Sequence, residues 1–274
     1  MDPDSNHYIA DSLNSNIDTR EFEKELNELF GKLCGNELDD ANLWPDIYEN
    51  IITKINSELS EPNEDDLICR YFTPAKFMWF AHQNSVYFGS ASDFEDKHDS
   101  DLPEDYKNCV KKVLMERDII PLYWDDYLER MRSRWLVSCW TSLDNHHDDY
   151  LLWHRYAGSE LGVGVVIAYG ELKKTLETEC KKIEGVKLFQ SGRVGYKHPL
   201  HLPPFNKRNI FRNEKEVRFA CKIELSASLS IDASSLKEHF SLRFSPDAPR
   251  AHIDSVLKVW EKMGGRSEYN ISDG

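Results

Sequence analysis

The residues best suited to chemistry lie between positions 205 and 219, where cations, carboxylates and aromatic rings follow one another closely. In a strand that begins near Lys215, Glu216 and Arg218 share one face, and Val217 and Phe219 share the other. The apolar face should pack into the core, which leaves Glu216 and Arg218 facing a surface or a cleft. Three cations upstream form a positive patch suited to a phosphate or pyrophosphate: Lys207, Arg208 and Arg212. The alternative is a solvated strand edge with surface ion pairs.

A second group of chemically useful residues occupies one helical turn ahead of Gly158. Trp153 and Tyr156 offer flat, amphipathic faces that could stack on a base or a nicotinamide ring. His154 or Arg155 could reach a phosphate or a ribose from the same turn. The alternative is an ordinary buried aromatic turn, because most Trp side chains simply pack.

Two acidic loops contain possible metal ligands at spacings that match no known site. They run from Asp93 to Asp101 and from Asp144 to Asp149. Adjacent His side chains such as His146 and His147 usually point apart, so the sequence predicts solvated loops and no metal. The cysteines stand singly, with neither a CxxC pair nor a His at ligand spacing, and this pattern favours reduced cytosolic thiols.

Composition restricts the class of protein further. The chain has 274 residues, of which 40% are hydrophobic, so it can bury one large core or two modest ones. Its formal net charge of -14 repels phosphate backbones at long range and argues against nucleic-acid binding through overall charge. No apolar run approaches the roughly 18 to 20 residues that a membrane-spanning helix needs, so we expect a cytoplasmic protein without a membrane partner.

The elements that must position these side chains fall into three parts. Residues 1–18 are polar and predict a flexible arm, and residues 19–65 show two amphipathic periods that predict a helical hairpin. The charged, proline-containing stretch from Ser60 to Asp66 predicts a linker, with the boundary near residue 65. Residues 66–274 then form the main domain.

Within the main domain, short apolar segments alternate irregularly with helical periods. The strands are expected at 67–72, 86–90, 135–140, 163–169, 186–197 and 215–225. Helices are expected at 75–82, on either side of Pro121, at 153–156, at 171–183 and around 253–260. This irregular order favours an α+β fold with a mixed or antiparallel central sheet flanked by helices over a regular parallel sheet.

The chain resembles the family known as domain of unknown function 2971 over about residues 67–260. The resemblance rests on six short strings: Cys69-Arg70-Tyr71-Phe72, Val86-Tyr87-Phe88-Gly89-Ser90, Phe94-Glu95-Asp96, Val137-Ser138-Cys139-Trp140, Leu152-Trp153-His154-Arg155-Tyr156 and Glu214-Lys215-Glu216-Val217-Arg218. The third string lacks the proline that the family usually carries after its Asp. The resemblance implies a bacterial or phage-related setting in defence or toxin systems, without fixing a reaction.

The order of three motifs is also similar to that in Arg-Ser-Glu ADP-ribosyltransferases: Arg70, then Ser90-Ala91-Ser92 or Ser138, then Glu214-Lys215-Glu216. This similarity implies NAD as the substrate, with Arg70 on phosphate and Tyr71 or Trp153 stacked on nicotinamide. Glu216 would then be the catalytic carboxylate, and Glu214 would orient the acceptor. The other expected NAD-binding residues are Tyr156, Lys207 and Arg218. Cleavage of the nicotinamide–ribose bond passes through an oxocarbenium-like state, which a nearby carboxylate stabilises.

Three functions follow as hypotheses. The first is an NAD-dependent ADP-ribosyltransferase or NAD-cleaving enzyme whose acceptor the sequence does not identify. The second is a non-catalytic module that senses a nucleotide or binds a regulatory protein partner. The third is a metal-dependent nuclease or other phosphoryl-transfer enzyme that uses the two acidic loops.

Overall fold

The computed structural model describes most of the main domain and little of what precedes it. The described ranges are 59–96, 98–101, 104–116, 132–143, 149–158, 160–196, 202–223 and 227–271, together with residues 23, 24, 27, 28 and 129. The expected flexible arm and nearly all of the expected helical hairpin lie outside these residues. So do the loop at 144–148 and the helix expected after Pro121, apart from a few positions at its end.

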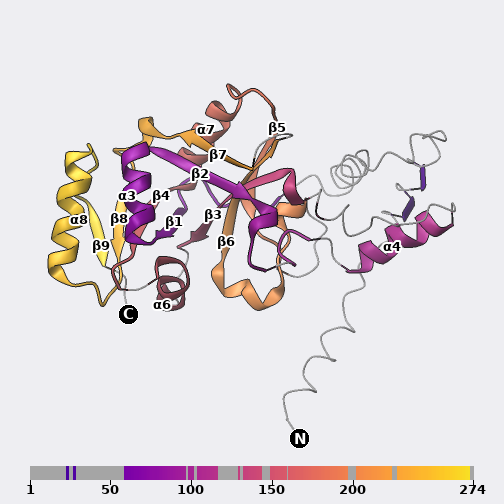
Figure 1. Cartoon of the computed structure of the whole chain (residues 1–274), viewed down its shortest axis with the longest axis horizontal. Helices are drawn as coiled ribbons and strands as arrows, with labels where there is room; N and C mark the ends of the chain where they lie inside the picture. Colours follow the sequence, from indigo (N-terminus) through magenta and orange to yellow (C-terminus); the bar gives the residue numbers. More distant parts are fainter. Residues whose placement is uncertain are drawn as a thin grey trace, which may run out of the picture.

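A mixed, mostly antiparallel sheet forms the centre of the fold (Figure 1). Its strands pair in the order β5-β6-β3-β1-β4-β8-β9, and β2 branches from β3 to pair with β7. Among the described residues, the β8–β9 pair alone is parallel. The strand bounds are β1 Leu67–Phe72, β2 Ser85–Ser90, β3 Trp135–Ser142, β4 Val163–Ala168, β5 Val186–Arg193, β6 Glu216–Ile223, β7 Ser228–Asp232, β8 Ser241–Phe244 and β9 Tyr269–Ile271.

The sheet forks at strand β3. One edge of β3 pairs with β6 along its length, from Trp135 opposite Lys222 to Thr141 opposite Glu216. The other edge is shared: β1 pairs with β3 at Thr141 and Ser142, whereas β2 pairs with it near the opposite end. The two partners then diverge, β1 toward β4 and β8 and β2 toward β7. The middle of β3 therefore faces the opening between β1 and β2.

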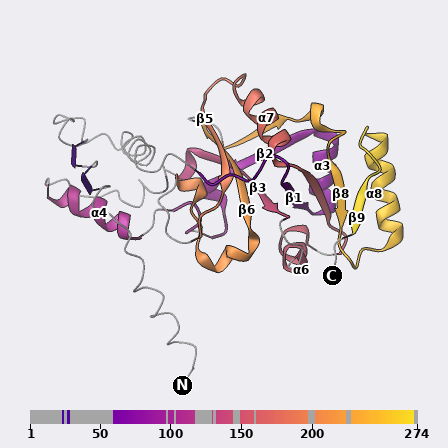
Figure 2. The same ribbon diagram turned by 180° about the vertical axis from the view of Figure 1, so that it is seen from behind.

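Helices α3, α7 and α8 lie beside the sheet (Figure 2) and contribute side chains to one apolar core. Trp260 of α8 stacks against Phe80 of α3, so these two helices pack on each other at the β8 side of the fold. Helix α7 buries Leu172 and Leu176 in the same core and contacts β4, β5 and β7. The helix bounds are α3 Pro74–Gln83, α4 Glu104–Met115, α6 Asp149–Leu152, α7 Tyr169–Cys180 and α8 Arg250–Lys262. The shorter helical turns are η4 Ala91–Asp93, η5 Trp153–Ala157, η6 Pro203–Phe205, η7 Asn209–Glu214 and η8 Ser234–Leu236.

The stretch expected to be a linker is bonded to the main sheet. The backbone N–H of Arg193 donates to the Ser60 carbonyl at 2.7 Å, and that of Gly170 donates to the Glu64 carbonyl at 2.9 Å. Gly170 approaches so closely that a Cβ there would lie 2.8 Å from Glu64 Cβ. Residues 59–66 are thus packed along β5 and the start of α7.

The sequence predicted this architecture in outline. The expected strand at 67–72 occurs with the same ends, those at 86–90, 135–140, 163–169, 186–197 and 215–225 occur with one or both ends shifted, and an α+β fold with a largely antiparallel sheet is confirmed. Strands β7, β8 and β9 were not predicted, because their three to five residues are too few for a clear alternation. No helix in the described part of the chain has the length and apolar character to cross a bilayer.

Candidate functional site

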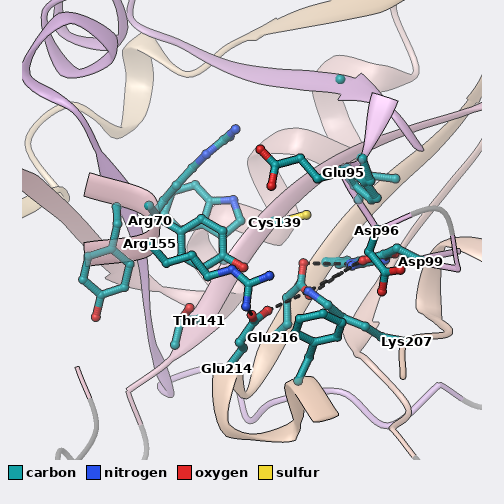
Figure 3. Close-up of a pocket in the computed structure, with 18 of the residues that line it drawn as sticks. Arg70, Glu95, Asp96, Asp99, Cys139, Thr141, Arg155, Lys207, Glu214 and Glu216 are labelled. Atoms are coloured by element: carbon teal, nitrogen blue, oxygen red, sulfur yellow. Dashed lines mark hydrogen bonds and ion pairs between the residues drawn. The ribbon is translucent and has the colours of Figure 1, made fainter. Parts of the chain in front are cut away.

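A pocket of about 470 Å³ opens where the sheet forks (Figure 3). Strands β1, β2, β3 and β6, the turn η5 and the loop that follows η4 all contribute side chains to its wall. Seven of the residues that the sequence singled out line this pocket: Arg70, Tyr71, Tyr156, Lys207, Glu214, Glu216 and Arg218. Segments that are far apart in the sequence therefore meet at one site.

Arg70 lies in the fork and joins the three strands around it. Its Nη1 donates to the Tyr87 carbonyl of β2 at 2.9 Å and to Ser138 Oγ of β3 at 2.7 Å. Neither its Nε nor its Nη2 donates to another described residue, and no described carboxylate pairs with it. Burial lowers the pKa of this guanidinium, with Cys139 and Tyr87 opposing that effect. A partly covered cation with two free donor groups is suited to an anion.

Arg218 lies at the buried end of the pocket and is fully engaged within the protein. Its Nε and Nη2 donate to the two oxygens of Glu216 at 2.8 and 3.0 Å. Its Nη1 and Nη2 also donate to the two oxygens of Asp99, at 2.7 and 2.8 Å, and Nη1 reaches the Pro204 carbonyl. All five donors are therefore used, so Arg218 positions the two carboxylates and has no donor left for a ligand.

Lys207 connects this buried group to Glu214. Its Nζ donates to Glu214 Oε2 at 2.6 Å and to Glu216 Oε2 at 2.8 Å (Figure 3). The other oxygen of Glu214 lies 2.8 Å from Arg155 Nη1, although the geometry there does not make a hydrogen bond. Arg155 is half-exposed, whereas Glu214 is buried. Glu214 Oε1 is thus a buried acceptor that is held by charge alone.

The charges in this network determine the protonation of Glu216. Burial raises the pKa of a carboxyl, but the positive charges of Arg218 and Lys207 outweigh that effect and hold the pKa of Glu216 at about 2. Burial lowers the pKa of Lys207, and the Glu216 carboxylate more than compensates and raises it. Glu216 is therefore ionised at neutral pH, and it supplies a fixed negative charge and not a proton.

The backbone around Lys215 places the two glutamates side by side. Turn η7 ends at Glu214, Lys215 adopts a left-handed conformation with φ of 44°, and β6 begins at Glu216. The reversal points the exposed Lys215 outward and directs both carboxyls toward Lys207. The Tyr196 hydroxyl accepts from the Glu216 N–H at 2.7 Å and so fixes the first residue of the strand.

Aromatic rings line the entrance to this charged network. The Arg155 guanidinium lies 4.7 Å from the centre of the Phe211 ring, and Lys207 Nζ lies 4.9 Å from the same centre. Tyr156 is 39% exposed and forms part of the wall. A flat ligand group could lie against these rings.

Four predicted site residues lie elsewhere or act indirectly. Trp153 is buried behind Tyr71, with ring centres 4.8 Å apart, and does not line the pocket. Ser90 and Ser92 bond to each other at 2.8 Å and also lie outside the wall. Ser138 is the serine that contacts Arg70, so the geometry selects it over the Ser90–Ser92 pair.

Two of the three cations that were expected to form an accessible phosphate patch are instead bonded to carboxylates. Lys207 is buried between Glu214 and Glu216, and Arg208 is paired with Asp96 through two hydrogen bonds of 2.9 and 3.0 Å. These two cations are neutralised within the protein, Arg208 by a carboxylate 112 positions away and Lys207 by carboxylates seven and nine positions further along the chain. Arg212, the third residue of the expected patch, is exposed and does not line the pocket, whereas Arg70 does.

The acidic loop from Asp93 to Asp101 serves the same network. Asp96 pairs with Arg208, Asp99 pairs with Arg218, and Asp101 pairs with Lys107 at 2.5 Å. Across the described part of the chain, no group of three His, Cys, Asp or Glu side chains is arranged to hold a metal ion. The loop thus binds cations of the protein itself, and the other acidic loop, at 144–148, lies outside the described residues.

Sequence reasoning missed two residues of the site. Asp99 was considered only as a metal ligand, yet it holds Arg218 across 119 positions of sequence, a separation that no local pattern reveals. Cys139 was counted among the cysteines and quoted in one string of the family resemblance but was given no role, yet it lies on the pocket wall. Burial and the Glu216 charge raise the pKa of Cys139, so its thiol stays protonated at neutral pH. The alternation of β3 could have indicated Cys139, since Thr141, two residues on, also lines the pocket.

Comparison with known proteins gives no family for this chain: no family model matches it, and neither a curated protein nor a solved structure matches it.

Proposed function

We propose that this pocket binds a nicotinamide dinucleotide and cleaves its nicotinamide–ribose bond, either to water or to an acceptor. The observation that carries the proposal is the guanidinium of Arg70, which pairs with no described carboxylate, in a pocket that also contains Glu214 and the ionised Glu216. Arg70 offers two free donor groups to a diphosphate, and the glutamates offer negative charge to the sugar that must become positive.

The charge state of Glu216 suits the proposed reaction. An oxocarbenium-like sugar is stabilised by a carboxylate that is already ionised and already oriented, since neither protonation nor reorientation then adds to the barrier. Arg218 fixes both oxygens of Glu216, and the low pKa of Glu216 keeps it charged at neutral pH. Glu214 has one oxygen that makes no hydrogen bond, and this buried atom would reach a ribose hydroxyl or an acceptor once the half-exposed Arg155 moves aside.

A specific observation favours a second candidate, nucleotide binding without turnover. Arg218 and Lys207 neutralise much of the negative charge of Glu216 toward a ligand. A site built this way could hold a nucleotide as a signal and leave its glycosidic bond intact.

The test is to incubate the purified chain with NAD labelled in the adenylate, with and without cell lysate, and to follow nicotinamide release and label transfer. We expect release by the wild type and a loss of at least about a hundredfold in Glu214→Gln and Glu216→Gln, on the scale measured for removal of one electrostatic stabiliser. Arg70→Gln should raise KM more than it lowers kcat, because the diphosphate contact is present in both the ground state and the transition state.

Matched variants separate chemistry from folding. Glu160→Gln and Arg250→Gln change exposed side chains outside the pocket and should release nicotinamide at the wild-type rate. Because Glu216→Gln disturbs a buried network, its unfolding midpoint must be measured alongside. No release by a folded wild type that still binds NAD saturably would reject cleavage and favour the second candidate. No binding at all would reject both.

A further inference from the structure

An exposed pair of aromatic rings extends the pocket beyond Arg70. Trp79 and Tyr87 meet edge to face with ring centres 6.0 Å apart, and each is 41% exposed. The other described Trp side chains are almost fully buried: Trp135, Trp140, Trp153 and Trp260. Tyr87 lines the pocket, and its ring lies over Gly89, where an added Cβ would be 3.4 Å from Tyr87 Cε1. Exposure of two large neighbouring rings at the rim of a pocket is typical of a binding surface.

The charges beside these rings are positive and unpaired. Lys76 lines the pocket three residues before Trp79 on helix α3, so both side chains project from one face of that helix. Among the described residues, no carboxylate pairs with Lys76 or with Arg70. The Tyr87 carbonyl accepts from Arg70, which fixes the ring pair and the guanidinium relative to each other. The pocket thus has an aromatic end with two cations that no described carboxylate pairs with and, at Glu214 and Glu216, an end where each carboxylate is balanced by a cation.

This polarity determines which end of a dinucleotide lies where. The nicotinamide ring is cationic and its ribose gains positive charge during cleavage, so both are disfavoured beside Lys76 and Arg70 and better accommodated beside the two carboxylates. Adenine is neutral, and its adjoining phosphates are negative, so it suits a stacking surface beside two cations. We infer that Trp79 and Tyr87 form the adenine subsite of the pocket, with Lys76 and Arg70 on the diphosphate. This inference rests on the proposed function, because it assumes a dinucleotide in the pocket.

The test compares two ligands that differ in the adenylate. Binding of a non-cleavable carbocyclic NAD analogue and of nicotinamide mononucleotide is measured by calorimetry for the wild type, Trp79→Ala and Tyr87→Ala. Loss of one base–aromatic stack should weaken the NAD analogue about 5- to 150-fold and leave nicotinamide mononucleotide unchanged. Tyr87→Phe should retain the affinity of the wild type, because the ring is kept. Met78→Ala, on the same helix, 42% exposed and outside the pocket wall, is the matched control.

The outcomes separate this inference from the proposed function. Weaker binding of the NAD analogue alone supports the adenine subsite. If both ligands weaken equally, or neither does, in folded variants, the subsite is overturned while the pocket remains a dinucleotide site. If the wild type binds neither ligand, the proposed function fails and the subsite fails with it.

Discussion

The two faces of strand β6 are both buried but are held in opposite ways. On one face, Val217, Phe219 and Cys221 lie in the apolar core, where Phe219 stacks on Tyr169 with ring centres 5.7 Å apart. On the other, Glu216 and Arg218 bond to each other and to the charges of Lys207 and Asp99. The apolar face needs only volume and shape, whereas each charge on the other face needs a particular partner. The difference suggests that the first face is tolerant of substitution and the second is not.

The largest effect should come from removing the centre of the charged face. Arg218→Gln leaves Asp99 and Glu216 buried beside a neutral amide, so we expect the free energy of unfolding to fall by about 3–5 kcal/mol. Denaturant unfolding measures this change, and Arg250→Gln, at an exposed site, should stay within about 0.5 kcal/mol of the wild type. A loss of less than about 1 kcal/mol for Arg218→Gln would show that the bonds of Arg218 to Asp99 and Glu216 do not stabilise the fold as argued.

Lowering the pH should remove stabilisation from the charged face of β6, because that face contains the ionised carboxylate of Glu216. The pKa of Glu216 is about 2 in the folded chain against an ordinary 4.5, so its ionised form stabilises the fold above pH 4.5. That contribution, about 3 kcal/mol, should be lost as the pH falls from about 4.5 toward 2.

The measurement is the free energy of unfolding as a function of pH for the wild type and Glu216→Gln. The slope between pH 4.5 and 2 should be shallower in Glu216→Gln, which cannot titrate at this position, and Glu160→Gln should keep the wild-type slope. Parallel curves for the wild type and Glu216→Gln would contradict the depressed pKa.

The smallest effect should come from a matched pair of substitutions that each remove one methylene. Ile223→Val shortens a side chain on the apolar face and should cost about 1 kcal/mol. Glu216→Asp withdraws the carboxylate from Arg218 and Lys207 and should cost more, about 2 kcal/mol, because hydrogen bonds to charged groups are lost. Thermal unfolding of both variants measures the two losses of stability. Equal losses would show that the charged face of β6 is no more sensitive to substitution than the apolar face.

The sequence predicted the apolar face well and the charged face only in part. The alternation of Val217, Phe219 and Cys221 was sufficient to place them in the core, because the core selects residue types without specifying partners. The same alternation correctly put Glu216 and Arg218 together on the opposite face. It could not show that Arg218 is saturated, since Asp99 and the Pro204 carbonyl come from other segments.

The site was predictable where one strand carries the signal and unpredictable where several segments meet. Arg70, Glu214 and Glu216 were identified from short motifs and do line one pocket. The choice between Ser138 and the Ser90–Ser92 pair depended on how β1 and β2 diverge from β3, which is a property of the sheet and not of either motif. The Lys207 patch was interpreted as accessible because nothing local indicates that Glu214 and Glu216 enclose it.

The place of Arg70 in the fork couples the pocket to the sheet itself. Strands β1 and β2 leave the same edge of β3, and the Arg70 side chain donates across the opening to Tyr87 of β2 and to Ser138 of β3. At the fork, hydrogen bonds from the Arg70 side chain therefore join strands that elsewhere in the sheet are joined by backbone hydrogen bonds. The Arg70 side chain thus links the two branches of the sheet, and a ligand bound to the free side of its guanidinium would contact both branches through it.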